Sequence, residues 1–199
     1  MDDKKDLKRQ RIKKYFIGAA REIIIREGFE SVSARKVADM AGFSYATIYN
    51  YFKDLNHMMR EVKESMIVEL YENLQNKMQW STYDIEELKR SLRIYVEYYF
   101  ENPNIFKFFY FYSFGSSDDN LEKQSEGIDY ANIWSEAFKG LIREEQMQEK
   151  EIDVAAKTLI YIIHGLITLY FSNHGDLTEE KVYDELDRMV DYVLLKNRV

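Results

Sequence analysis

The chain has 199 residues, of which 46% are hydrophobic and 15% aromatic, a composition that excludes an intrinsically disordered protein. A single proline and eight glycines favour long helices, and the lack of cysteine excludes disulfides and thiolate metal sites. The net charge of −7 is unevenly distributed: residues 1–60 hold 13 Lys or Arg against 8 Asp or Glu, and the remainder holds 15 against 27. A basic first third can bind a polyanion even in an acidic protein, because phosphate contacts are local.

Two segments bear on the cellular location. Residues 1–16 lack the apolar run that a signal peptide needs. The longest apolar run, residues 158–171, contains a histidine and is too short to cross a bilayer. We therefore expect a cytoplasmic protein with no membrane segment, in which residues 158–171 form a buried helix.

The first third shows apolar residues at helical spacing. They predict a helix over residues 7–27 that Gly28 ends as its C-cap. A second helix is predicted over residues 34–41, where Ser33 can cap its first turn. Gly42 directly after this helix can supply a tight turn.

A third helix is predicted over residues 45–51 with Ser44 as its N-cap, and Asp54 begins a long fourth helix that ends near residue 77. Two short helices joined by a tight turn and packed on a longer helix form a helix-turn-helix, which offers its second helix to the major groove of DNA. Four polar residues of the third helix are expected to face outward: Tyr45, Thr47, Asn50 and Tyr51.

The alternative is that these four are ordinary surface residues. Their hydroxyl and amide groups suit bases and phosphates, and Arg35, Lys36 and Lys53 lie nearby in the sequence. These neighbours favour a DNA-binding role.

The segment "AAREIIIREGFESVSARKVADMAGFSYATIYNYF" within residues 9–60 resembles the DNA-binding domain of the TetR-family transcriptional regulators. The shared pattern is the A-A of the first helix, the E-G-F that ends it, the V-A-x-x-A-G-F-S turn and the T-I-Y-x-Y-F that follows. The resemblance implies an all-α fold and a set of DNA-binding residues: Ser33, Arg35, Lys36, Ser44, Tyr45, Ala46, Thr47, Tyr49, Asn50 and Tyr51.

One position departs from the family pattern. The family usually has Lys near the start of the fourth helix, where it binds phosphate, and this chain has Leu55. Two sources of replacement charge remain open, Lys53 and the basic N-terminal segment. The cations of that segment are Lys4, Lys5, Lys8, Arg9, Arg11, Lys13 and Lys14.

The rest of the chain is also predicted to be helical. Helices are expected over residues 84–101, from residue 104 after a break at Asn102-Pro103, and then over 128–145, 152–173 and 177–196. We divide the chain into a DNA-binding domain, residues 1–53, and a ligand-sensing and dimerisation domain, residues 54–199. The resemblance implies a homodimer through the helices 152–173 and 177–196, and hence an inverted-repeat operator.

Aromatic residues are concentrated between residues 95 and 114. Core packing explains at least half of them, and His164 is more often a core residue than a ligand anchor. Together with the implied sensor domain they nevertheless suggest an apolar pocket with a few polar anchors. The candidate ligand-binding residues are Tyr95, Tyr99, Phe106, Phe109, Tyr110, Trp134, Tyr161 and His164. A flat aromatic or amphipathic cation and a fatty acyl chain both suit such a pocket.

The fourth helix is expected to link the two domains, so a ligand that favours one placement of this helix would change operator affinity. We expect a repressor that a small hydrophobic or amphipathic ligand releases, with activation left open, and no cofactor or metal. Two alternatives are an enzyme that uses the aromatic pocket and a helical scaffold without DNA binding. The sequence has no G-x-S-x-G, P-loop or dinucleotide fingerprint, which disfavours the enzyme.

Overall fold

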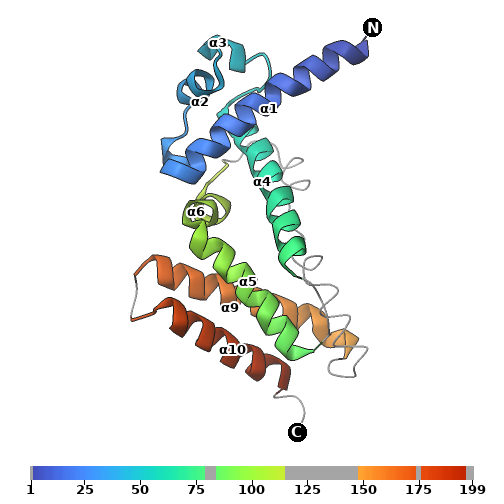
Figure 1. Cartoon of the computed structure of the whole chain (residues 1–199), viewed down its shortest axis with the longest axis vertical. Coiled ribbons are helices and arrows are strands. Elements are labelled where there is room, and N and C mark those ends of the chain that lie inside the picture. The colour runs from blue at the N-terminus through green and yellow to red at the C-terminus, as the bar shows by residue number, and fades with distance from the viewer. Residues whose placement is uncertain (1, 79–83, 115–147, 174–175, 196–199) are drawn as a thin grey trace. The chain divides into compact units, whose positions relative to one another are not determined.

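The computed structural model describes residues 2–78, 84–114, 148–173 and 176–195, and these residues form helices and connections without a strand (Figure 1). The α-helices are α1 (Asp2–Glu27), α2 (Ala34–Ala41), α3 (Tyr45–Ile48), α4 (Leu55–Lys77), α5 (Ile85–Glu101), α6 (Pro103–Phe111), α9 (Ile152–Phe171) and α10 (Glu179–Leu195). Two 3₁₀ turns, η1 (Phe29–Ser31) and η2 (Glu149–Glu151), complete the described elements. The predicted all-α fold is confirmed, while the predicted helix over 128–145 lies outside the described residues.

The helix bounds differ from the prediction at two places. Helix α1 begins at Asp2, five residues before the expected start, because the Lys and Arg residues that precede the apolar pattern are strong helix formers. Helix α3 ends at Ile48, three residues early, because the N–H groups of Asn50 and Tyr51 bond to carbonyl groups three residues back. This tighter turn carries Phe52, which is 2% exposed, into the core.

The described residues pack into two compact units, and each unit combines segments that are separated in the sequence. The first unit contains residues 2–70 and 102–114, and the second contains residues 71–78, 84–101, 148–173 and 176–195. Helix α4 therefore begins in the first unit and ends in the second, and the α5–α6 break at Asn102 also lies at a boundary.

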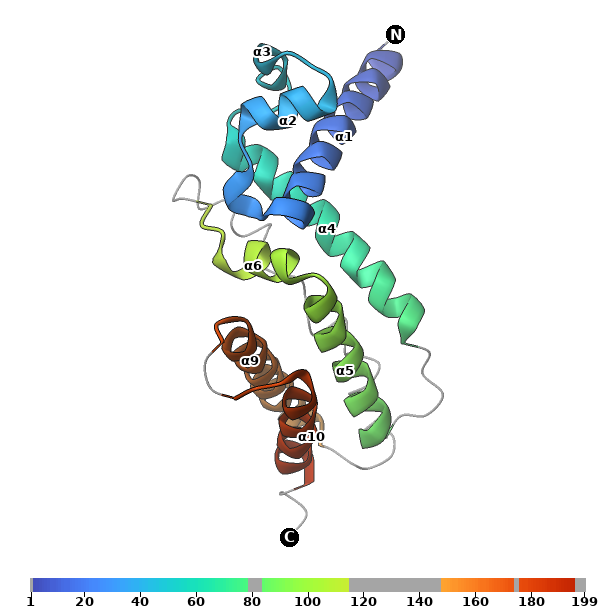
Figure 2. The same ribbon diagram turned by 60° about the vertical axis from the view of Figure 1, so that its left-hand side comes forward.

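The first unit is built on α1, against which α2 and α6 pack, with α3 on α2 (Figures 1 and 2). Its core includes the fully buried side chains of Phe16, Ile23 and Ile24 from α1 and Met58 and Met59 from α4. Burying each such side chain contributes roughly 1.5 to 3 kcal/mol. The core therefore holds α2 and α3 against a rigid base.

Local signals set the α2–α3 turn. Ser33 Oγ accepts a hydrogen bond from the Lys36 N–H at 3.3 Å, as expected of an N-cap. Gly42 ends α2 with a φ of 77°, a left-handed conformation that favours glycine, and the Phe43 N–H then bonds to Ala38 O at 2.9 Å. The expected cap by Ser44 is not formed, because its hydroxyl bonds to Thr47 Oγ1 instead.

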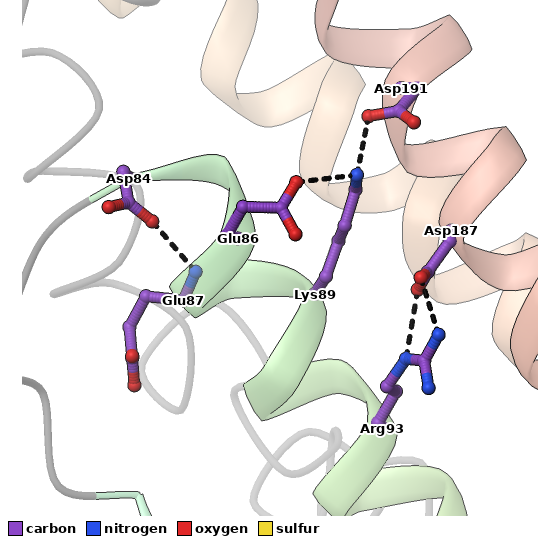
Figure 3. Close-up of polar contacts among 7 residues, drawn as sticks. All are labelled: Asp84, Glu86, Glu87, Lys89, Arg93, Asp187 and Asp191. Carbon is purple, nitrogen blue, oxygen red and sulfur yellow. Dashed lines mark hydrogen bonds and ion pairs between the residues drawn. The ribbon is translucent and has the colours of Figure 1, made fainter.

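The second unit packs α5, α9 and α10 against one another. Five apolar or aromatic residues that share one face of α5 are all buried: Leu88, Leu92, Tyr95, Val96 and Tyr99. Ion pairs fix the register of α5 against α10, where Lys89 Nζ lies 2.8 Å from Asp191 Oδ1 and Arg93 Nε lies 3.1 Å from Asp187 Oδ1 (Figure 3). The one-turn step on each helix shows that the two helices run antiparallel.

Helix α9 is the longest apolar helix among the described residues. Its length and composition would suffice to cross a membrane, a test that the core helix of a water-soluble protein also passes. Leu159, Ile163 and Ile167 are buried on one face, whereas Val154 and Tyr161 are 67% and 72% exposed. Among the described residues, one face of this helix is buried and the other carries exposed apolar side chains.

Candidate functional site

The exposed surface of the α2–α3 motif carries pairs of hydroxyl groups. The Tyr45 and Tyr49 hydroxyls lie 2.9 Å apart, their rings meet edge to face at 5.3 Å, and both side chains are nearly half exposed. The hydrogen bond with Tyr45 raises the pKa of Tyr49 above its ordinary value, which keeps this phenol neutral. The hydroxyls of Ser44, which directly precedes Tyr45, and of Thr47 lie 2.8 Å apart. Neutral hydroxyls can both donate to phosphate and bond to base edges.

Tyr51 differs from the outward position expected for it. Its side chain is half-buried, with its ring 5.8 Å from that of Phe16 and under the Arg9 guanidinium at 5.4 Å. Thr47 is also half-buried, whereas Ala46 and Asn50 are exposed. Tyr51 therefore joins α1 to the turn after α3, and Arg9 is a neighbour of the motif that spacing alone did not reveal.

The expected cations differ in their surroundings. Arg35 and Lys53 are exposed, while Lys36 Nζ lies 2.5 Å from Glu27 Oε2. Leu55, at the first position of α4, is half-buried. Asp54 caps α4 as predicted, since its Oδ1 accepts the His57 N–H at 2.7 Å. The start of α4 therefore lacks the cation that the family pattern usually places there.

Three of the predicted ligand-binding residues come together in the second unit. The Tyr95 hydroxyl lies 3.0 Å from His164 Nε2 and donates to the Tyr99 hydroxyl at 3.5 Å. Burial lowers the pKa of His164 to about 4, so the imidazole is neutral at neutral pH. The site thus presents neutral hydrogen-bonding groups within an apolar core.

The other predicted ligand residues belong to other elements or lie on the exposed side of α9. Phe106, Phe109 and Tyr110 are on α6 in the first unit, and Tyr161 is exposed on α9. Trp134 lies outside the described residues.

Ser91 is a polar residue that the sequence analysis missed. It is fully buried on α5, one turn before Tyr95, and its hydroxyl has no hydrogen-bond partner in the described structure. Ser91 lies between Leu88 and Leu92 on the buried face of α5, and this position is the sequence signal that could have identified it. An unpaired buried hydroxyl costs roughly 1 to 3 kcal/mol, which a ligand with a hydrogen-bonding group would offset.

Among the described residues, no group of three or more His, Asp or Glu side chains could hold a metal ion.

Comparison with known proteins places the motif in a family. The model of the "Bacterial regulatory proteins, tetR family" matches residues 16–62, which include α2, α3 and the start of α4. No curated protein matches the sequence.

Solved structures share the fold over most of the chain. The transcriptional regulator FadR from Bacillus subtilis in complex with stearoyl-CoA has a TM-score of 0.69 at 18% identity and covers 91% of this chain and 97% of its own. Thermus thermophilus FadR, a TetR-family repressor in complex with lauroyl-CoA, has a TM-score of 0.66 at 16% identity, with 92% and 93% covered. RolR in complex with resorcinol has a TM-score of 0.67 at 18% identity, with 95% and 94% covered. Residues 16–62 therefore match the DNA-binding segment of the tetR family of bacterial regulatory proteins, and the chain shares its fold with these solved structures over about nine-tenths of its length.

Proposed function

We propose that this protein is a homodimeric transcriptional repressor that binds an inverted-repeat operator through the α2–α3 motif and is released by a small ligand held in its second unit. The hydroxyl-rich surface of that motif, within the segment that matches the family, carries the proposal. We assign residues 1–53 to DNA binding and residues 54–199 to ligand sensing and dimerisation.

The hydroxyl pairs are the proposed base and phosphate contacts. Tyr45 and Tyr49 are exposed, neutral and already oriented toward each other, so they lose little side-chain freedom on binding. Exposed Arg35, in the first turn of α2, supplies a phosphate contact.

The proposed dimer interface is the face of α9 and α10 that carries exposed apolar side chains. Val154 and Tyr161 are exposed on α9, and Met189 and Tyr192 are exposed on α10. Exposed apolar residues on two packed helices favour an interface, and a twofold dimer buries the same patch on both subunits. The two motifs of the dimer would then meet major grooves about 34 to 36 Å apart, which requires an inverted repeat.

The described interior of the second unit favours a ligand with a neutral polar group on an apolar body. Ser91, Tyr95 and His164 offer neutral hydrogen-bonding groups, which suit a carbonyl or hydroxyl. The buried Glu87 is paired with Arg90, so it offers no counter-charge to a cation. An acyl chain or a phenol therefore fits better than an amphipathic cation, in keeping with the stearoyl-CoA, lauroyl-CoA and resorcinol of the similar structures.

Coupling between ligand and DNA is proposed to pass along α4, which begins in the first unit and ends in the second. A ligand that favours one placement of this helix changes the separation of the two motifs in the dimer. Coupling energies of this kind are about 1 to 3 kcal/mol, which corresponds to roughly 5- to 150-fold in operator affinity.

The DNA-binding step is tested by selecting the purified protein on a randomised duplex library. We expect an inverted repeat to be enriched, and Tyr45→Phe/Tyr49→Phe to bind it at least about tenfold more weakly, because each lost hydrogen bond costs about 1 kcal/mol. Tyr71→Phe, which removes an exposed hydroxyl from α4, is the matched control and should bind normally. If no sequence is enriched at low salt, the helical scaffold without DNA binding becomes the better explanation.

The ligand step is tested by adding stearoyl-CoA, lauroyl-CoA or resorcinol to the protein–operator complex. We expect at least one probe to bind the protein and weaken operator binding at least about fivefold. A probe that binds the second unit without changing operator affinity would contradict the proposed coupling.

A further inference from the structure

The N-terminal end of α1 extends beyond the core of the first unit. Phe16 is the first fully buried residue of α1, whereas every residue from 4 to 11 is exposed. In both views this end of α1 lies at the same end of the first unit as α3 (Figures 1 and 2). We call residues 4–11 the α1 extension, and its helical turns are not explained by core packing.

One row of side chains on this extension points toward the turn after α3. Residues at i, i+4, i+7 and i+11 share one face of a helix, and one such row is formed by Lys5, Arg9, Ile12 and Phe16. The inner end of the row is fixed by Phe16, whose ring lies 5.8 Å from Tyr51. Arg9, two turns further out, lies over the same Tyr51 ring at 5.4 Å. Lys5 therefore lies one turn beyond Arg9 on the side of α1 that faces Tyr51.

A second, neighbouring row points toward the turn between α2 and α3. It is formed by Lys4, Lys8, Arg11 and Tyr15. The Tyr15 ring lies 6.3 Å from that of Phe43, which follows Gly42 in this turn. The row therefore runs along the side of α1 that faces the α2–α3 turn.

The two rows concentrate positive charge, and no described side chain is ion-paired with most of it. Asp6 is the only acid between residues 4 and 14. In the described structure Lys4, Lys5, Lys8 and Arg11 form no ion pair, whereas Lys13 Nζ, just inside the core boundary, lies 2.6 Å from Glu61 Oε1. Like charges one turn apart repel each other, and a polyanion beside the helix would relieve this repulsion.

We infer that the α1 extension is a second DNA-binding element, which contacts phosphates beside the segment read by the α2–α3 motif. The inference rests on the proposed DNA-binding function and adds to it a site that the family match, residues 16–62, does not include. The extension supplies charge that the start of α4 lacks, because Leu55 stands where the family usually has Lys. Phosphate contacts add affinity and position the protein without reading bases.

The test measures how operator affinity depends on salt, using the inverted repeat selected by the wild-type protein. The slope of log K against log salt falls in magnitude by about 0.9 for each lost phosphate contact. Lys5→Gln/Lys8→Gln removes two phosphate contacts from each protomer, which should reduce the magnitude of the slope by about 2 per protomer. In a dimer, the total reduction should be about 4. Gln and Lys have similar helix propensities, so far-UV circular dichroism should be unchanged.

The matched control is Lys107→Gln/Lys150→Gln, which removes the same charge from exposed positions outside α1 and should keep the wild-type slope. The extension variant should still enrich the same inverted repeat, because phosphate contacts carry no base preference. An unchanged slope in the extension variant, with normal wild-type binding, would overturn this inference alone. If the wild-type protein binds no duplex, the proposed function fails with it.

Discussion

Acidification should destabilise this protein through His164. The imidazole lies in α9 with Nε2 3.0 Å from the Tyr95 hydroxyl, and burial lowers its pKa from 6.5 to about 4. A base whose pKa is lower in the folded state binds more protons when the chain is unfolded. Stability is therefore lost as pH falls below about 6.5, and the loss is complete once pH drops below about 4.

The size of the effect follows from the two pKa values. One pKa unit corresponds to 1.36 kcal/mol, so the full loss is about 3 kcal/mol, of which about 2 kcal/mol appears between pH 7 and pH 5. Two kcal/mol is a large fraction of the stability of an ordinary domain.

The assay is urea denaturation at pH 7 and pH 5, followed by circular dichroism. His164→Gln retains hydrogen-bonding groups and cannot titrate, so it should lose about 2 kcal/mol less than the wild type between these pH values. His57→Gln is the matched control, because it removes a histidine from the first unit and leaves His164 in place. Equal acid losses in the wild type and His164→Gln would refute the reasoning.

Three further substitutions test the packing and the proposed ligand site. Gly42→Ala should lower the free energy of unfolding, measured by urea denaturation, by about 1 kcal/mol. A Cβ would meet no atom within 4 Å, so the cost comes from the φ of 77°, which an alanine adopts only with strain. Lys89 is 8% exposed and its aliphatic stem is packed, while its ion-pair partner Asp191 can be hydrated by solvent (Figure 3). Lys89→Met keeps this packing and should therefore lower the free energy of unfolding by about 1 kcal/mol or less. Lys89→Ala removes the packed stem and should lower it clearly more. Ser91→Ala should raise the stability of the ligand-free protein by about 1 kcal/mol, because it removes a buried unpaired hydroxyl, and should weaken binding of the active probe in a titration.

Structural features that depend on residues close together in the sequence were predicted well. Helix α2 has the expected bounds, with Ser33 as its cap and Gly42 at its end, because caps and left-handed turns depend on one or two residues. The buried apolar residues of α5 also follow helical spacing, because this spacing determines which residues share a face. The family resemblance added the role of the α2–α3 motif.

Contacts between distant segments could not be predicted in this way. The aromatic residues near residues 95–112 are neighbours in the sequence, and packing assigns Tyr95 to the second unit and Phe106 to the first. The break at Asn102-Pro103 is visible in the sequence, but the unit to which each side belongs depends on packing. Tyr51 was expected to face outward and is instead half-buried between Phe16 and Arg9.

The sequence by itself therefore determined the approximate positions of the described helices, the caps at Ser33 and Asp54 and the presence of a helix-turn-helix, because these features depend on residues within a few turns of one another. Only the tertiary structure decided which hydroxyls pair on the exposed surface of the motif and that His164 meets Tyr95 while Ser91 has no partner in the described part of the chain. It also decided that the cations of the α1 extension line the side facing the motif. These arrangements depend on how helices pack across long stretches of chain, and residue spacing carries no record of that packing.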